Sequence, residues 1–157
     1  MKTGKKDNRE WRFGAGEWDT EPDWAVFDAS GFGCAMQRNG QGAWCGYVLV
    51  PEWHPLHGAK LQHGEPVWLN VHGGVTWDSV MHFQPELELT ASFAVGFDCS
   101  HSSDLSPRDL ARGMVFGDYC NFQYAMDETE GLASQIMMHA PMEQLCRVFS
   151  GSDDEVK

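Results

Sequence analysis

Polar side chains that can bind a metal ion or move a proton follow two apolar stretches of this chain. His72 comes directly after residues 67–71, and Asp98 and His101 follow residues 93–97. Large apolar residues alternate with other residues in both stretches, which predicts two half-buried β-strands. Because functional groups favour loops that a rigid scaffold holds, we expect the two strand ends to bring these side chains together.

Two histidines and a carboxylate can serve as metal ligands and as catalytic residues. We expect His72, Asp98 and His101 to have both roles, with zinc or manganese as the divalent metal. A bound metal would activate water, so the expected reaction class is metal-assisted hydrolysis. The alternative is a capped loop, in which the carboxylates of Asp98 and Asp104 accept backbone N–H groups and His101 is a polar residue with its hydrogen bonds satisfied.

We expect four more residues of the site to bind the ligand: Gly73, Gly74, Asp104 and Cys99. Glycines let backbone N–H groups approach an anion closely, although two adjacent glycines equally mark a tight turn. Asp104 can share a metal with a histidine or orient it for proton transfer. Cys99 can be a nucleophile with His101 or His72 as its base, or an inert thiol buried at a strand end.

Local patterns elsewhere in the chain define the elements that would position this site. Five stretches have the apolar content or alternation of β-strands, and they are 24–27, 32–36, 44–50, 67–71 and 93–97. Ser106 followed by Pro107 is typical of a helix start, with a capping hydroxyl before the proline. Apolar residues at helical spacing predict one amphipathic helix over about residues 118–139. These residues are Phe122, Met126, Thr129, Ala133 and Ile136.

Strands followed by a helix are typical of the α+β class. We therefore expect an antiparallel or mixed sheet with a C-terminal amphipathic helix packed on one face. The length of 157 residues fits one domain with its own core. We expect a single globular α+β domain over residues 24–149, between two polar segments. Residues 1–23 are the polar N-terminal segment, whose first ten residues form a loose tail, and residues 150–157 are a polar tail.

Charge and cysteine content narrow the function classes. The formal net charge is −12, and an acidic surface repels phosphates, so direct nucleic-acid binding is not expected. Such a surface can instead approach a basic protein. The five cysteines include no Cys-x-x-Cys pair, the first ten residues lack an apolar signal sequence, and no apolar run is long enough to span a membrane. We expect reduced thiols in a cytoplasm.

The seven tryptophans have two interpretations. Exposed indole rings can stack on a nucleobase, which would suit a small nucleotide-like ligand. Trp24, Trp44 and Trp68 can instead be core residues, and we favour this interpretation for most of them.

Several sequence blocks resemble a family of small proteins encoded by tailed bacteriophages and prophages. The blocks lie between about residues 45 and 136, and they are CGYV at 45–48, VP at 50–51, HPL at 54–56, VHGG at 71–74, GFDCSH at 96–101, DLSP at 104–107 and LASQ at 132–135. The chain differs from typical members of this family at Trp53, where they have glycine, and at Val75, where they have leucine. It also differs at Ser100, where they have alanine-like residues.

The resemblance implies a phage gene product that works in the cytoplasm of the bacterial host, as an accessory protein for host takeover or counter-defence. Combined with the predicted site, it suggests a protein that binds a small nucleotide-like or phosphorylated ligand and, if it is an enzyme, hydrolyses that ligand with metal assistance. The alternative is a non-enzymatic acidic inhibitor that engages a basic host protein. The sequence leaves both hypotheses open.

Overall fold

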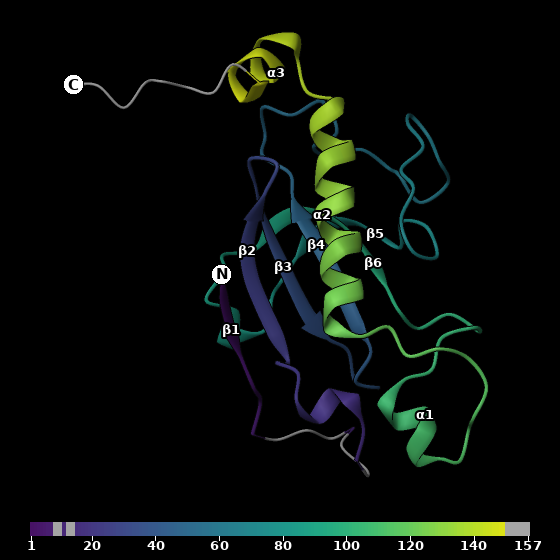
Figure 1. Cartoon of the computed structure of the whole chain (residues 1–157). Helices are drawn as coiled ribbons and strands as arrows, with labels where there is room; N and C mark the ends of the chain where they lie inside the picture. Colours follow the sequence, from purple (N-terminus) through teal and green to yellow (C-terminus); the bar gives the residue numbers. More distant parts are fainter. Residues whose placement is uncertain (8–10, 12–14, 150–157) are drawn as a thin grey trace.

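A six-stranded antiparallel sheet forms the centre of the structure, a computed structural model that describes residues 1–7, 11 and 15–149. The strands are ordered β1-β2-β3-β4-β6-β5 across the sheet (Figure 1). Their bounds are β1 Lys2–Gly4, β2 Trp24–Ala29, β3 Phe32–Arg38, β4 Trp44–Leu49, β5 Trp77–Met81 and β6 Ser92–Asp98. The helices are α1 Pro107–Ala111, α2 Phe122–Met138 and α3 Met142–Phe149, with short 3-10 turns at Glu17–Asp19 and Pro85–Leu87. The chain is therefore of the α+β class, as predicted.

Tight turns connect β2, β3 and β4. Ser30 and Gly31 join β2 to β3, and both have positive φ angles, 51° and 82°, as a two-residue hairpin turn requires. Asn39 organises the turn between β3 and β4, because its side-chain oxygen accepts hydrogen bonds from the N–H groups of Gln41 and Ala43. The strands predicted at 24–27, 32–36, 44–50 and 93–97 are confirmed as β2, β3, β4 and β6.

The strand predicted over residues 67–71 is wrong, because this segment has no regular secondary structure and is paired with none of the described strands. The side chain of Gln135 in α2 holds its backbone instead. That side chain accepts the N–H of Asn70 (2.7 Å) and donates to its carbonyl oxygen (2.7 Å). Leu69 and Val71 are buried, whereas Asn70 between them is exposed. The alternating sequence of residues 67–71 thus arises because one side of the segment faces the core and the other faces solvent, although the segment is not a β-strand.

The N-terminal residues take part in the sheet. Lys2–Gly4 forms β1, which pairs with β2 in antiparallel register. The expectation of a loose tail over the first ten residues is therefore wrong for residues 2–4, whose backbone groups have strand partners. The predicted polar tail at residues 150–157 lies outside the described residues.

Helix α2 shares one hydrophobic core with the sheet. It contacts β2, β3 and β4, and it runs alongside these strands in Figure 1. Asn121 caps its start, since the Asn121 side-chain oxygen accepts the N–H of Tyr124 (2.9 Å). Four of the residues predicted at helical spacing are buried, and they are Met126, Thr129, Ala133 and Ile136. None of the described helices is both long and apolar enough to cross a membrane.

The tryptophans divide between the two interpretations. Trp44 is fully buried, Trp24 is half-buried, and Trp68 is 74% exposed. The core interpretation is therefore confirmed for Trp44 and wrong for Trp68, which lies in the segment 67–71 that pairs with none of the described strands.

A buried histidine ties the loop after β4 to α2. Nε2 of His54 lies 2.8 Å from the carbonyl oxygen of Ile136, and Nδ1 accepts the N–H of Leu56 (3.0 Å). These two partners require the neutral imidazole with its hydrogen on Nε2. Burial lowers the pKa of His54 below its ordinary value; the hydrogen bond to Ile136 opposes this shift, and nearby His139 adds to it.

We expect His54 to make the stability of the fold depend on pH below neutrality. The folded-state pKa lies below the ordinary value of 6.5, so between these two values the unfolded chain binds more protons than the folded chain. The stabilisation is complete above the unfolded pKa and is lost as the pH falls toward the folded pKa. Urea denaturation at about pH 7.5 and about pH 5.5 should show a smaller loss for His54→Gln than for the wild type. An equal loss in the wild type, in His54→Gln and in the exposed control His82→Gln would contradict this role.

Candidate metal centre

His72 lies at the centre of the site and is held by three neighbours. Its backbone N–H donates to a carboxylate oxygen of Glu128 (2.8 Å), and its Nδ1 lies 2.8 Å from the hydroxyl of Tyr124. Its Nε2 lies 2.9 Å from each carboxylate oxygen of Asp104. Since a carboxylate only accepts, the neutral imidazole carries its hydrogen on Nε2 and accepts the tyrosine hydroxyl at Nδ1. Tyr124 and Glu128 are one helical turn apart, so one face of α2 holds both the ring and the backbone of His72.

Asp104 connects the two histidines of the predicted site. Its Oδ2 accepts the backbone N–H of His101 (2.9 Å) and lies 3.1 Å from Nδ1 of His101. Burial alone would raise the pKa of the Asp104 carboxyl, but hydrogen bonds from His72 and from the His101 N–H outweigh this effect and lower the pKa. The carboxylate is therefore ionised near neutral pH, as a metal ligand or a proton acceptor must be.

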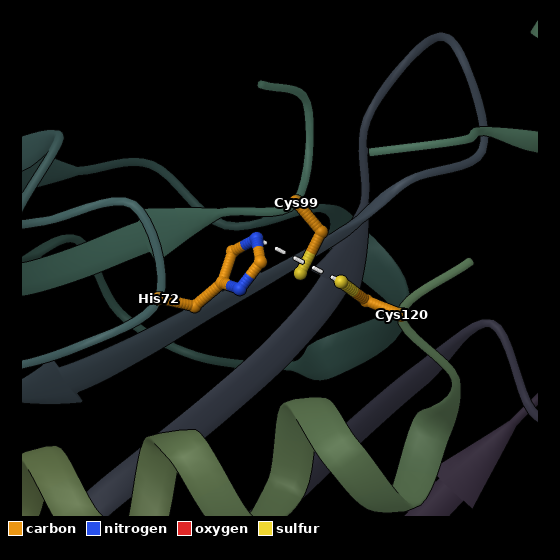
Figure 2. Close-up of side chains that lie close together, drawn as sticks. All are labelled: His72, Cys99 and Cys120. Atoms are coloured by element: carbon orange, nitrogen blue, oxygen red, sulfur yellow. Dashed lines mark hydrogen bonds between the residues drawn. The ribbon is translucent and has the colours of Figure 1, made fainter. Parts of the chain in front are cut away.

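Two cysteine thiols lie next to His72 (Figure 2). Sγ of Cys120 is 3.7 Å from Nε2 of His72 and 3.7 Å from Oδ1 of Asp104. Cys99 directly follows β6, and its hydrogen bond with Cys120, together with burial, raises the pKa of its thiol. One ligand atom from each of His72, Cys99 and Cys120 lies within 4.8 Å of the others.

Among the described residues, two sets of side chains are grouped closely enough to hold a metal ion, and both include His72. One set adds Cys99 and Cys120, and the other adds His101 and Asp104. Nitrogen with sulfur suits zinc, whereas nitrogen with oxygen suits zinc, manganese or iron. Zinc bonds of about 2.0 Å to nitrogen and about 2.3 Å to sulfur place tetrahedral ligands ~3.5 Å apart. The distance of 3.7 Å between His72 Nε2 and Cys120 Sγ is close to this value.

A pocket of about 390 Å³ adjoins the two sets. His72, Asp104 and Cys120 contribute to its wall. The other lining residues are Ser103, Asp118, Tyr119, Asn121 and Tyr124. These residues include two carboxylates and neither lysine nor arginine. A phosphorylated ligand would therefore need a bound cation to offset the negative charge of the wall.

A buried ion cluster supports the segment 119–122, which carries one of the two thiols. The guanidinium of Arg38 donates to the hydroxyl of Tyr119 (2.8 Å), and that hydroxyl donates to a carboxylate oxygen of Glu21 (2.6 Å). The other carboxylate oxygen of Glu21 accepts the backbone N–H of Phe122. The N-terminal part of the chain thus fixes the entry into α2 and one wall of the pocket.

The structure brings together most, but not all, of the predicted site residues. His72, His101, Asp104 and Cys99 form one cluster, whereas Asp98 belongs to neither set of candidate metal ligands. The Asp98 carboxylate accepts the backbone N–H of Ser100 (3.0 Å), and it lies 3.9 Å from Nδ1 of His101. Asp104 therefore occupies the position next to His72 that Asp98 was expected to fill.

The two glycines after His72 have a structural role. Both have positive φ angles, 67° at Gly73 and 83° at Gly74. The N–H of Gly74 donates to the carbonyl oxygen of Val71 (2.8 Å), so the turn itself uses this donor. A Cβ on Gly73 would lie 2.1 Å from a ring carbon of His101, so only glycine lets this ring approach the backbone. Neither glycine lines the pocket beside His72.

Sequence reasoning missed Cys120, Tyr124 and Glu128. None of them belongs to a recognisable motif, and each is more than forty residues from His72 along the chain. The capping residue Asn121 is a sequence signal from which these three positions could have been predicted. It sets the helix start at residue 122, which places the cysteine just before the helix and the other two residues on one helical face.

Comparisons of the chain with protein-family models, with curated proteins and with solved structures found no match. The chemical interpretation of the site therefore depends on its own geometry.

Proposed function

We propose that this chain binds a divalent metal ion, zinc, at His72 and uses it within a small-ligand pocket. The supporting observation is the convergence of both donor sets on one atom, Nε2 of His72. A neutral imidazole has a single hydrogen at this position, yet two carboxylate oxygens and a thiol all face it. A cation at the same place would interact favourably with all of these donors.

The surrounding residues suit hydrolysis. Zinc with three protein ligands supplies an activated water molecule at neutral pH. Asp104 is ionised and can accept a proton beside the thiols, while His101 fixes the orientation of its carboxylate. Tyr124 and Glu128 hold His72 in place from α2. In this proposal α2 covers one face of the sheet.

The ligand in this proposal is a small nucleotide-like or phosphorylated molecule of a size that fits the pocket. The acidic wall makes recognition of its phosphates depend on the metal. The resemblance of residues 45–136 to small tailed-phage and prophage proteins supports a setting in the cytoplasm of a bacterial host. The biological role would then be that of an accessory protein for host takeover or counter-defence.

The net charge of −12 favours a second candidate function, a non-enzymatic inhibitor of a basic host protein. In that case the metal would only stabilise the fold, and the acidic surface would form the complex. Capture of a basic protein that weakens steeply with rising salt, and that persists in a metal-free variant, would favour this candidate over the first.

Elemental mass spectrometry of the purified protein tests the metal centre. We expect about one zinc ion per chain in the wild type, none in His72→Ala, and the wild-type amount in the exposed control His82→Ala. Circular dichroism would establish that His72→Ala is folded. Absence of any divalent metal from wild-type protein, even after incubation with zinc, would refute the proposal.

Two further variants identify which donor set holds the metal. Cys120→Ser removes a sulfur donor, and His101→Ala removes the second imidazole. Loss of zinc in Cys120→Ser but not in His101→Ala would assign the ion to the cysteine set, and the opposite result would assign it to the set with Asp104.

A further inference from the structure

Cys99 and Cys120 form a thiol pair that the proposed hydrolysis does not explain. Cys99 comes directly after β6, and Cys120 comes directly before the residue that caps α2. Their sulfur atoms point toward each other and lie within 4.8 Å (Figure 2). Both side chains are buried, so the packing of the fold holds the two thiols close together.

The two thiols have different surroundings. Cys120 lines the pocket, its sulfur is 3.7 Å from Nε2 of His72, and it stands at the N-terminal end of a 17-residue helix. Cys99 does not line the pocket. A small reagent in the pocket therefore meets Cys120 first, with Cys99 behind it.

We infer that Cys120 and Cys99 are a reversible redox pair, in which a peroxide oxidises Cys120 and Cys99 then closes a disulfide. In the first step the Cys120 sulfur attacks hydrogen peroxide; an S–O bond forms, the O–O bond breaks, and the leaving hydroxide takes a proton to become water. In the second step the Cys99 sulfur attacks the Cys120 sulfur; an S–S bond forms, the S–O bond breaks, and the Cys99 proton leaves with hydroxide as water. Two thiols and one peroxide thus give one disulfide and two waters. Two equivalents of a small thiol then return both cysteines to thiols by thiol–disulfide exchange and are themselves oxidised to a disulfide.

The disulfide would also control the metal centre, and this part of the inference depends on the proposed function. Sulfur atoms bonded to each other are not available as thiolate ligands, so zinc held by the set with Cys99 and Cys120 and the disulfide exclude each other. For zinc in that set, the bound ion should protect the pair from oxidation, and oxidation of the metal-free form should prevent zinc binding.

Oxidation of the metal-free protein tests the pair directly. The background is Cys146→Ser, because Cys146 is exposed and would react on its own. After chelation and treatment with hydrogen peroxide, we expect the loss of two titratable thiols per chain and a cross-linked peptide that joins residues 99 and 120. Cys99→Ser should instead stop at a sulfenic acid on Cys120 that dimedone traps, and Cys120→Ser should leave Cys99 unmodified. Cys34→Ser, which removes a buried thiol whose pKa burial raises to about 12, is the control and should still form the disulfide.

The outcomes separate this inference from the proposed function. Formation of the disulfide in a protein that binds no zinc would support the redox pair and refute the metal centre. Zinc binding by a protein whose metal-free form makes no 99–120 disulfide would support the metal centre and overturn the redox pair. Reaction with dimedone at Cys99 but not at Cys120 would also overturn it, because the order of attack would be reversed.

Discussion

Replacing Arg38 with methionine is expected to lower the free energy of unfolding by about 3–5 kcal/mol. The Arg38 guanidinium is buried and donates to the carboxylates of Asp23 (3.1 Å) and Glu21 (3.4 Å). It also lies over the ring of Trp44, 4.2 Å from the ring centroid. Methionine would keep much of the apolar packing but would leave two buried carboxylates without their cation. The cost of burying those charges without the guanidinium, and not the loss of contact area, determines the size of the effect.

Chemical denaturation of the variant and of two comparison proteins measures this effect. Arg38→Lys keeps the charge but cannot reproduce the planar fork that also donates to Tyr119, so we expect a smaller but clear loss. The exposed Arg112→Met is the control and should change stability by less than about 0.5 kcal/mol. A loss in Arg38→Met no larger than that of the control would show that the ion cluster does not stabilise the fold.

Gly46→Ala is expected to lower the free energy of unfolding by about 1–3 kcal/mol, although the change adds a single methyl group. A Cβ on Gly46 would lie 2.2 Å from Oγ1 of Thr129 and 2.5 Å from the ring of Phe97. Both of these side chains are fully buried, so neither can move into solvent. Alanine also restricts the unfolded chain, which favours folding by about 0.4–1 kcal/mol, but the overpacking between β4 and α2 is the larger effect.

A double-mutant cycle identifies the contact responsible. Thr129→Ala removes the nearer of the two obstructing groups, together with a hydrogen bond from Thr129 to the carbonyl oxygen of Ala125 (2.7 Å). The double variant Gly46→Ala/Thr129→Ala should therefore be more stable than the sum of the single effects implies. Gly40→Ala is the matched control, because a Cβ on Gly40 would meet no heavy atom within 4 Å. Strict additivity of the two changes would exclude the proposed clash.

Local sequence patterns predicted most of the fold because most of it obeys them. The run Trp44 to Leu49 is buried on both faces, and the apolar positions of α2 follow helical spacing, so each element could be identified without its neighbours. The prediction failed at residues 67–71, where the partner of the backbone is a side chain. No local pattern distinguishes a segment whose backbone pairs with the Gln135 side chain from one whose backbone pairs with another strand.

The candidate site was predictable only within single loops. Asp98, His101 and Asp104 lie close together in sequence, so reasoning from spacing found all three but could not tell which carboxylate turns toward His72. Asp98 turns toward Ser100, whereas the backbone N–H of His101 holds Asp104 in place. Cys120 lies in a segment that is distant in sequence from the rest of the cluster. Its position depends on how α2 packs against the sheet, and no short motif in the sequence predicts that packing.

The centre around His72 is assembled from three separate parts of the chain, namely the turn after residue 71, the loop 99–104 and the segment 120–128. An unfolded chain does not hold these parts together, so a ligand of the whole cluster binds the native state and not the denatured one. Such a ligand shifts the folding equilibrium by mass action, by about 2.7 kcal/mol at a hundred times its dissociation constant. Occupancy of the cluster would then protect the chain from proteolysis, and the amount of intact protein in a cell would vary with the supply of that ligand.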